Sequence, residues 1–336
     1  MKKFALLFLI SVFLFAFASC SGNKTEETTA GEEASEETTE TVPSEENQTS
    51  DSVAEDSTAE GETSEVLYEN GFTFAEYNKD CYIITACDKS MNSSLSIDLP
   101  SSFNGKNVVA LGDGVFADWT DIYNVNIPSS ITEIGENAFK NCVKLNDVEI
   151  PDSVTLIKSG AFMNCTALSN LKLGAGLVTI QSFAFKGCTA LTEISVPTKV
   201  TSIGMNCFED CTALTKVTLS EELTSLGQYC FKNCSALTDI KLTSKLKEIS
   251  DNTFEYCTSL KEIDIPANIT KICSHAFNGC TSLEKVTVGD ALKTIEGSAF
   301  RSCTSLLSVE LPKRTSADSK AFFDSPTERK DKAAAK

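Results

Sequence analysis

Hydrophobic side chains along the chain recur at a fixed spacing of 23 residues. The most regular position carries phenylalanine ten times in succession, at Phe116, Phe139, Phe162, Phe185, Phe208, Phe231, Phe254, Phe277, Phe300 and Phe323. A period this strict indicates a repeat protein in which each unit forms one coil, stacked on coils of equal length. Because the repeated residues build such a scaffold, function is sought among the residues that do not repeat.

Other columns within the unit predict its local structure. Cysteine follows the phenylalanine after three residues and leucine after six, and the positions nine, eleven, fifteen and eighteen residues on are also apolar. The segment Leu145-x-x-Val148-x-Ile150 alternates like a short strand with one buried side, and a proline such as Pro151, which lacks an N–H, ends that strand. We expect Val154–Ile157 to cross the opposite side of the coil and the Ala-Phe-x-x-Cys stretch to turn back as a short helical or 3₁₀ turn. The predicted fold is an α/β-type, β-rich solenoid with a parallel strand sheet on one face.

The repeat resembles the treponemal-type, BspA-like leucine-rich repeat family. The shared string is I-P-x-x-V-x-x-I-x-x-x-A-F-x-x-C-x-x-L-x-x-V-x-I, with clear copies at Ile127–Ile150 and Ile150–Leu173, and the resemblance covers about residues 116–323. Proline is missing from the pattern at Gly174, Ser220, Thr243 and Gly289. The last unit also departs from it, with Asp318 in place of isoleucine and Pro326 in place of cysteine, as terminal coils often do. The resemblance implies a right-handed coil stack and an exported or cell-surface protein used in adhesion.

Residues 1–19 read as a secretory signal. Lys2 and Lys3 precede an apolar core over Phe4–Phe17, and small residues follow at Ala18-Ser19. The next residue, Cys20, resembles the acylated cysteine of a bacterial lipoprotein cleavage box, so we expect a lipid-anchored protein of the outer membrane or cell surface, or of the periplasmic side. An ordinary cleaved signal followed by an unrelated cysteine is the alternative.

The regions that flank the repeats differ from them in composition. Residues 20–66 are rich in Glu, Thr and Ser, with 15 acidic residues and one base in positions 21–66, so they supply −14 of the net charge of −18. Such a segment cannot bury enough apolar surface to fold, and we expect a disordered tether.

Residues 67–115 are predicted to form an N-terminal cap with a β-hairpin, from the Asn70-Gly71 and Asn104-Gly105 turn signals and a strand over Cys81–Cys87. Residues 116–323 are the predicted solenoid and residues 324–336 a charged C-terminal tail.

The 14 cysteines do not predict a disulfide framework. Eight of them fall on one column, where side chains in register run parallel and keep their Cβ atoms about 4.8 Å apart, farther than the roughly 3.8 Å of a disulfide. We expect buried free thiols that pack as small apolar groups. Cys207 and Cys230 start a second short column, and the Cys-x-x-x-Cys spacing there does not match the short flexible spacers of structural zinc sites.

Candidate chemistry is sparse. The single histidine, His275, has no nucleophile motif around it, and the sequence has no phosphate-binding loop. We therefore predict no enzyme activity, no cofactor and no metal site; an enzyme would need a carboxylate pair assembled across coils. The acidic balance and the lack of a basic stripe argue against nucleic-acid binding.

The outward positions of the predicted strands remain as the candidate ligand-binding surface. These positions lie seven, eight and ten residues after each phenylalanine and are polar and of mixed charge. The candidate residues are Tyr123, Asn146, Asp147, Glu149, Lys172, Glu193, Lys216, Asp239, Lys241, Lys261, Glu262 and Asp264. These residues either form a solvated surface without a ligand or form a face that binds a ligand.

The leading hypothesis is a lipid-anchored protein that binds a protein or glycan partner in adhesion. The resemblance implies host extracellular matrix or neighbouring cells as partners. With Tyr123 as the only aromatic anchor, we expect modest affinity, or affinity gained from many copies on a surface. The second hypothesis is a periplasmic or envelope scaffold without a host ligand.

Overall fold

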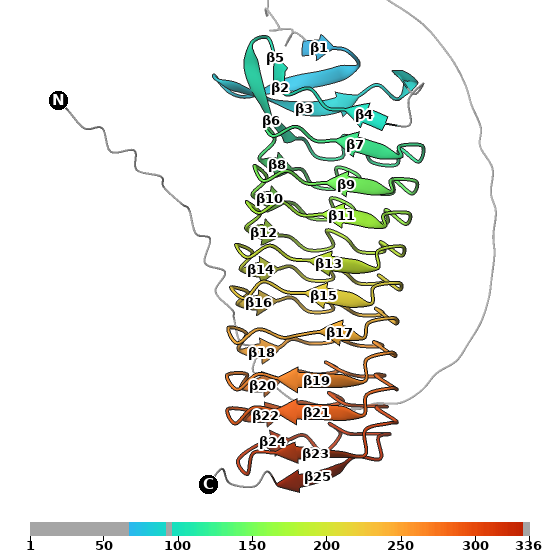
Figure 1. The fold of residues 1–336 in the computed structure, drawn as a ribbon, viewed down its shortest axis with the longest axis vertical. Coiled ribbons are helices and arrows are strands. Elements are labelled where there is room, and N and C mark those ends of the chain that lie inside the picture. Colours follow the sequence, from blue (N-terminus) through green and yellow to red (C-terminus); the bar gives the residue numbers. More distant parts are fainter. Residues whose placement is uncertain (1–66, 92–95, 332–336) are drawn as a thin grey trace, which may run out of the picture. The chain divides into compact units, whose positions relative to one another are not determined.

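The computed structural model describes residues 67–91 and 96–331, which belong to one compact unit. They form a β-solenoid of about 11 turns, in which short strands stack coil upon coil (Figure 1). The predicted signal peptide (1–19), the tether (20–66) with Cys20, and the end of the tail (332–336) lie outside the described residues.

The first strands precede the regular coils. Strands β1 (Leu67–Glu69), β2 (Phe72–Asn78) and β3 (Cys81–Cys87) pair antiparallel in sequence, and a 3₁₀ turn, η1 (Lys89–Met91), follows. Strand β5 (Ser102–Phe103) pairs antiparallel with β6 (Lys106–Leu111), and β3 pairs parallel with β6. Asn70-Gly71 and Asn104-Gly105 each have positive φ at both residues, as turns of this type require.

Each coil of the solenoid contributes strands to two ladders. The first, called here the long ladder, contains β4 (Ser96–Asp98), β7 (Asn124–Asn126), β9 (Asp147–Glu149), β11 (Asn170–Lys172), β13 (Glu193–Ser195), β15 (Lys216–Thr218), β17 (Asp239–Ile240), β19 (Glu262–Ile265), β21 (Lys285–Val288), β23 (Ser308–Leu311) and β25 (Glu328–Asp331). Paired strands are parallel, and residues 23 apart lie side by side, as Val148 does with Leu171. Breaks divide this ladder into the groups β4–β11, β13–β17, β19–β21 and β23–β25. The predicted parallel sheet and its 23-residue register are confirmed.

The second ladder, called here the short ladder, starts from β6. It contains β8 (Glu133–Ile134), β10 (Leu156–Ile157), β12 (Thr179–Ile180), β14 (Ser202–Ile203), β16 (Ser225–Leu226), β18 (Glu248–Ile249), β20 (Lys271–Ile272), β22 (Thr294–Ile295) and β24 (Ser316–Ala317), with a break between β16 and β18. Its pairs are also parallel, and the second residue of each strand from β8 to β22 points into the core.

The phenylalanine column forms the centre of the core. The nine rings from Phe116 to Phe300 are fully buried, and successive rings stack with centroids 5.0–5.7 Å apart. Stacking at this spacing combines buried apolar area with favourable ring geometry, and it requires equal coil lengths.

The final coil breaks the phenylalanine period. Phe322, 22 residues after Phe300, stacks on the Phe300 ring at 5.2 Å, whereas Phe323 is 52% exposed. Thr294 likewise pairs with Ser316, 22 residues later instead of 23. The segment between Phe300 and β24 is therefore one residue shorter than the equivalent segment of the earlier coils. The expectation that Phe323 continues the column of scaffold phenylalanines is therefore wrong. The coils also continue past residue 323, because β25 pairs with β23 inside the predicted tail.

The cysteine column confirms the expectation of buried free thiols and adds a role for them. All eight thiols are buried and unbridged, and each donates a hydrogen bond from Sγ to the carbonyl oxygen of the phenylalanine in the preceding coil, at 3.1–3.3 Å. The column ends at Ser325, whose hydroxyl donates to the Phe300 carbonyl at 2.5 Å. With the one-residue offset, Ser325 rather than Pro326 takes the cysteine position.

The α/β-type assignment is corrected to a β-solenoid with almost no helix, since the described residues contain η1 and no α-helix. The reason lies two residues before and two residues after each phenylalanine. In one coil Asn137 and Asn141 have φ of 53° and 61°, and the same two positions are left-handed in the following coils. An α-helix needs negative φ at every residue. The turn therefore bonds to the next coil instead, as Phe139 N–H does to the Ala161 carbonyl at 2.7 Å.

Candidate ligand-binding face

The outward side chains of the long ladder form a continuous polar surface, called here the strand face. Alternation along each strand sets it up, because residues such as Val148 and Ile194 point into the core while their neighbours point out. All twelve candidate residues lie on this face, eleven of them exposed and Asn146 partly buried.

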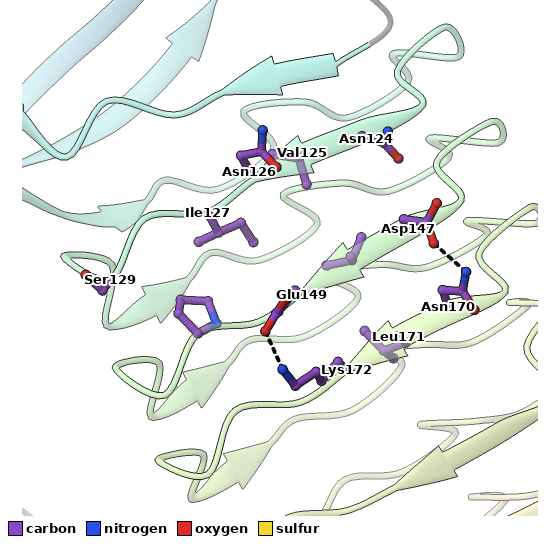
Figure 2. A pocket seen from close by; sticks show the side chains of 12 residues that line it. Asn124, Val125, Asn126, Ile127, Ser129, Asp147, Glu149, Asn170, Leu171 and Lys172 are labelled. Atoms are coloured by element: carbon purple, nitrogen blue, oxygen red, sulfur yellow. Dashed lines mark hydrogen bonds and ion pairs between the residues drawn. The ribbon is translucent and has the colours of Figure 1, made fainter.

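A first hollow of about 760 Å³ lies on β7, β9 and β11. Ile127, Pro151 and Leu171 supply apolar surface to it, and Asn124, Asn126 and Asp147 are among its polar lining (Figure 2). Figure 2 shows two links across the strands. Lys172 donates to Glu149 at 2.5 Å, and the Asn170 amide donates to Asp147 at 2.5 Å. The Asn124 Oδ1 atom is buried and has no hydrogen-bond partner among the described residues.

A second hollow of about 640 Å³ lies further along the same face, on β15, β17 and β19. Asp239, Lys241 and Asp264 line it together with Leu219, Leu242 and Pro266. Lys245 and Glu222 form an ion pair at its side. The two hollows thus share a composition, with apolar surface at the ends of the strands and charged side chains around it.

Charges on the strand face partly neutralise one another across coils. Besides Lys172 with Glu149, Lys216 lies 3.9 Å from Asp239 and Lys285 lies 3.6 Å from Glu262. The pKa of Lys172 is raised, because its ammonium donates a hydrogen bond to Glu149 and feels that charge. Water screens exposed pairs of this kind, so each contributes little to stability and its side chains remain able to pair with a ligand instead.

The structure brings only part of the predicted set together. Glu149 and Lys172 share the first hollow with Asp147, and Asp239, Lys241 and Asp264 share the second. Tyr123, Asn146, Glu193, Lys216, Lys261 and Glu262 line neither hollow. Tyr123 is 45% exposed, so the single aromatic residue of the predicted face stands outside both concave regions.

The twelve candidates leave out the amides and the apolar edges of the first hollow. The register itself places Asn124, Asn126 and Asn170 at outward positions of the same strands, so the sequence already marks these amides as part of the face. Ile127 and Leu171 belong to columns expected to be buried, yet both are only partly buried and contribute surface.

The fold and this face define a leucine-rich repeat protein of the β-solenoid kind. A family model for the BspA type leucine-rich repeat region matches residues 90–215 and 201–328, in six copies. The chain belongs to this family. Leucine-rich repeat proteins generally bind protein partners, and this family comprises scaffolds that are typically non-enzymatic and typically exported or at the cell surface.

Two solved bacterial leucine-rich repeat proteins are similar to the chain. A leucine-rich repeat protein from Bacteroides ovatus is 26% identical over 78% of this chain and 89% of its own, with a TM-score of 0.54. The Treponema pallidum leucine-rich repeat protein is 27% identical over 63% of this chain and 88% of its own, with a TM-score of 0.47. No curated protein matches the chain. Among the described residues, no helix has the length and apolar character needed to cross a bilayer.

Proposed function

We propose that this protein is an exported, lipid-anchored adhesion scaffold that binds a protein partner through the two hollows of the strand face. The observation that carries the proposal is the repetition of the same arrangement, apolar surface beside charged side chains, on two groups of coils along one face. Protein interfaces combine an apolar centre with a polar rim in this way. Two weak sites on one scaffold also strengthen each other by raising the effective concentration.

A protein partner fits the hollows better than a glycan does. Neither hollow is lined by an aromatic ring against which a sugar could stack. The first hollow offers carboxylate and amide oxygens, and a modest rotation of Asn124 would let a partner N–H satisfy its unpaired oxygen. Host extracellular-matrix proteins are the partners we propose to test first.

Anchoring rests on the sequence alone. Cys20 follows the apolar signal core and small residues, so we propose that acylation there holds the protein at the outer membrane or cell surface, with residues 21–66 as the spacer. We also propose that the antiparallel strands β1–β3 cap the solenoid. Phe74 packs on Phe103, at 4.1 Å between ring centroids, and both rings belong to the same buried core as the phenylalanine column, which supports this cap.

Binding of the chain from residue 21 onward to immobilised matrix proteins, beside a glycan array, tests the function. Saturable binding to a matrix protein supports the proposal. Binding to glycans alone would mean that the partner is a glycan and not a protein. Protease treatment of intact cells tests the location. A protein that remains protected would favour the second candidate, an envelope scaffold.

A further inference from the structure

Three side chains from successive coils converge near residue 273, on the side of the short ladder and away from the strand face. Asp251, Cys273 and Glu296 follow strands β18, β20 and β22, and their ligand atoms all lie within 4.8 Å of one another. The ligands of a tetrahedral zinc ion, bonded at about 2.0–2.3 Å, are roughly 3.5 Å apart, so small side-chain rotations would bring the three atoms onto one ion.

The position of Cys273 is unusual in this fold. Four residues before the column phenylalanine, four of the six earlier coils carry glycine, at Gly112, Gly135, Gly204 and Gly227, and the other two carry Lys158 and Gln181. A Cβ on Gly227 would lie 2.5 Å from the backbone of Gly204, so backbones approach closely there. The C-terminal coils have polar side chains at the equivalent positions instead, namely Ser250, Cys273, Glu296 and Asp318.

The thiol of Cys273 also differs from the other buried thiols. Each thiol of the core column donates to a phenylalanine carbonyl, and backbone hydrogen bonds reach Cys207 and Cys230 as well. Cys273 is 4% exposed, yet its Sγ makes no hydrogen bond within the described part of the chain. It faces the carboxylates of Glu248, Asp251 and Glu296 and the ammonium of Lys271. A buried thiol without a hydrogen-bond acceptor, set among carboxylates, is available as a metal ligand.

The two carboxylates are already oriented. The Ser274 backbone N–H donates to Asp251 at 3.0 Å and to Glu296 at 3.1 Å, and Gln228 donates to the other oxygen of Asp251 at 2.9 Å. Lys271 pairs with Glu296 at 2.7 Å. Partners of this kind fix the direction of metal ligands.

Charge balance and access are also satisfied. A thiolate and two carboxylates carry three negative charges, which a divalent cation together with the Lys271 ammonium would neutralise. A cavity of about 400 Å³ adjoins the cluster, with Ser274 and Glu296 on one side and Asp318 on the other. Of the three ligands only Glu296 lines it, so an ion, and a water molecule as fourth ligand, would approach from the Glu296 side.

We propose that Asp251, Cys273 and Glu296 form a binding site for a borderline divalent cation of the zinc class. On binding, a sulfur–metal bond forms and the thiol proton is released to solvent. Sulfur among the ligands selects zinc-like ions over calcium and magnesium, which take oxygen ligands only. The site does not depend on the proposed binding function, because its residues lie outside both hollows of the strand face.

Titration of the full chain with Zn²⁺, in a form carrying Cys20→Ser, tests the proposal by calorimetry. We expect one tight equivalent. Cys273→Ser, Asp251→Asn and Glu296→Gln should each weaken Zn²⁺ binding at least about tenfold, because even groups that only hydrogen-bond to a metal ligand change the affinity about 10–100-fold. Cys81→Ser and Glu284→Gln are matched controls at residues outside the cluster, and they should leave the affinity unchanged.

Binding of Co²⁺ tests directly whether the Cys273 thiolate is a metal ligand. The full chain should show a thiolate-to-cobalt charge-transfer band that Cys273→Ser abolishes and Cys81→Ser retains. If Cys273→Ser fails to fold, the isosteric Glu296→Gln still decides the matter through the Zn²⁺ affinity. Unchanged Zn²⁺ affinity in the cluster variants, or competition by Ca²⁺ at equal concentration, would overturn the proposal.

Discussion

The Nζ atom of Lys232 lies 2.8 Å from a carboxylate oxygen of Glu255 in the next coil, and the Glu255 side chain is only 8% exposed. Both residues directly follow a column phenylalanine, as do Lys186 and Glu209, which pair at 2.5 Å two coils earlier. Asn252 and Asn278 donate further hydrogen bonds to Glu255. These ion pairs lie on the turns and have buried carboxylates. Breaking one of them should therefore cost more stability than breaking an exposed pair of the strand face.

Replacing Lys232 by methionine should destabilise the solenoid by about 3 kcal/mol, because it leaves the Glu255 carboxylate buried without its counter-ion. Urea unfolding of the two proteins measures the difference. Lys172→Met is the matched control, since Lys172 pairs with Glu149 on the exposed strand face, and it should have much less effect on stability. Equal losses from the two variants would show that burial of the pair is unimportant.

The same carboxylate should make stability depend on acid pH. Burial opposes ionisation of Glu255, but hydrogen bonds from Lys232, Asn278 and Asn252 outweigh it, so its pKa is lowered from 4.5. A group with a lower pKa in the folded state contributes stability that is fully present above its unfolded pKa and is lost as pH falls through the folded pKa. The free energy of unfolding should therefore decline below about pH 4.5, and Glu255→Gln should lose this part of the decline. A parallel decline in the variant would assign the effect to other groups.

The one-residue offset in the last coil predicts unequal effects of two adjacent substitutions. Phe322→Ala should lower stability, because its ring stacks on Phe300, whereas Phe323→Ala should be close to neutral. In the centre, Phe208→Ala should cost about 3–5 kcal/mol, as core truncations of this size do. Thr215→Ala, on the exposed strand face, should cost little. Thermal unfolding measures all four, and a larger effect from residue 323 than from residue 322 would refute the offset.

The buried thiol column should resist alkylation in the folded protein. Burial raises the pKa of Cys142 and Cys303 to about 12, and it raises the pKa of the more central thiols further, so little thiolate exists at pH 8. In a Cys20→Ser chain, peptide mapping after treatment with iodoacetamide should find label at Cys81 first and in the column only after unfolding. Rapid labelling of the column in the native state would mean that coils open locally.

Charge reversal in the first hollow should weaken binding of the proposed partner. Lys172→Glu places two like charges beside each other at Glu149, and we expect a loss of about tenfold in affinity for a matrix protein. Lys144→Glu is the control, because Lys144 is similarly charged and forms its ion pair with Asp121 outside both hollows. Surface plasmon resonance measures both, and equal losses would point to a general charge effect.

Periodicity predicted the core because a buried column allows few residue types. The stacked rings and the parallel register followed directly from the phenylalanine and leucine spacing. The turns did not, because positive φ at Asn137 and Asn141 depends on single residues that vary from coil to coil, at Phe183 and His275 for example. Phe322 and Phe323 are adjacent in sequence, so spacing alone could not reveal which ring enters the core.

The candidate sites divide in the same way. Strand alternation placed Glu149 and Lys172 outward correctly, since it depends only on the pleat. The first hollow depends on how far Leu171 of β11 and Pro151, which follows β9, remain exposed beside each other, and their column positions do not predict that exposure. The cluster around Cys273 combines two repeat positions from three coils. Asp251 lies three residues before its column phenylalanine, whereas Cys273 and Glu296 lie four before theirs, so comparing residues within one column does not reveal the cluster.

Strand β25 has a consequence for how copies of this protein behave together. It pairs on one side with β23, and among the described strands it has no partner on the other. Its sequence is Glu-Arg-Lys-Asp, four charged residues in a row, where the inner strands alternate charged and apolar ones. An exposed edge invites another chain to add to the sheet, and charged side chains discourage that addition. The charges of β25 thus discourage a second copy from pairing its strands with this edge, and so discourage fibres built by end-to-end stacking of copies.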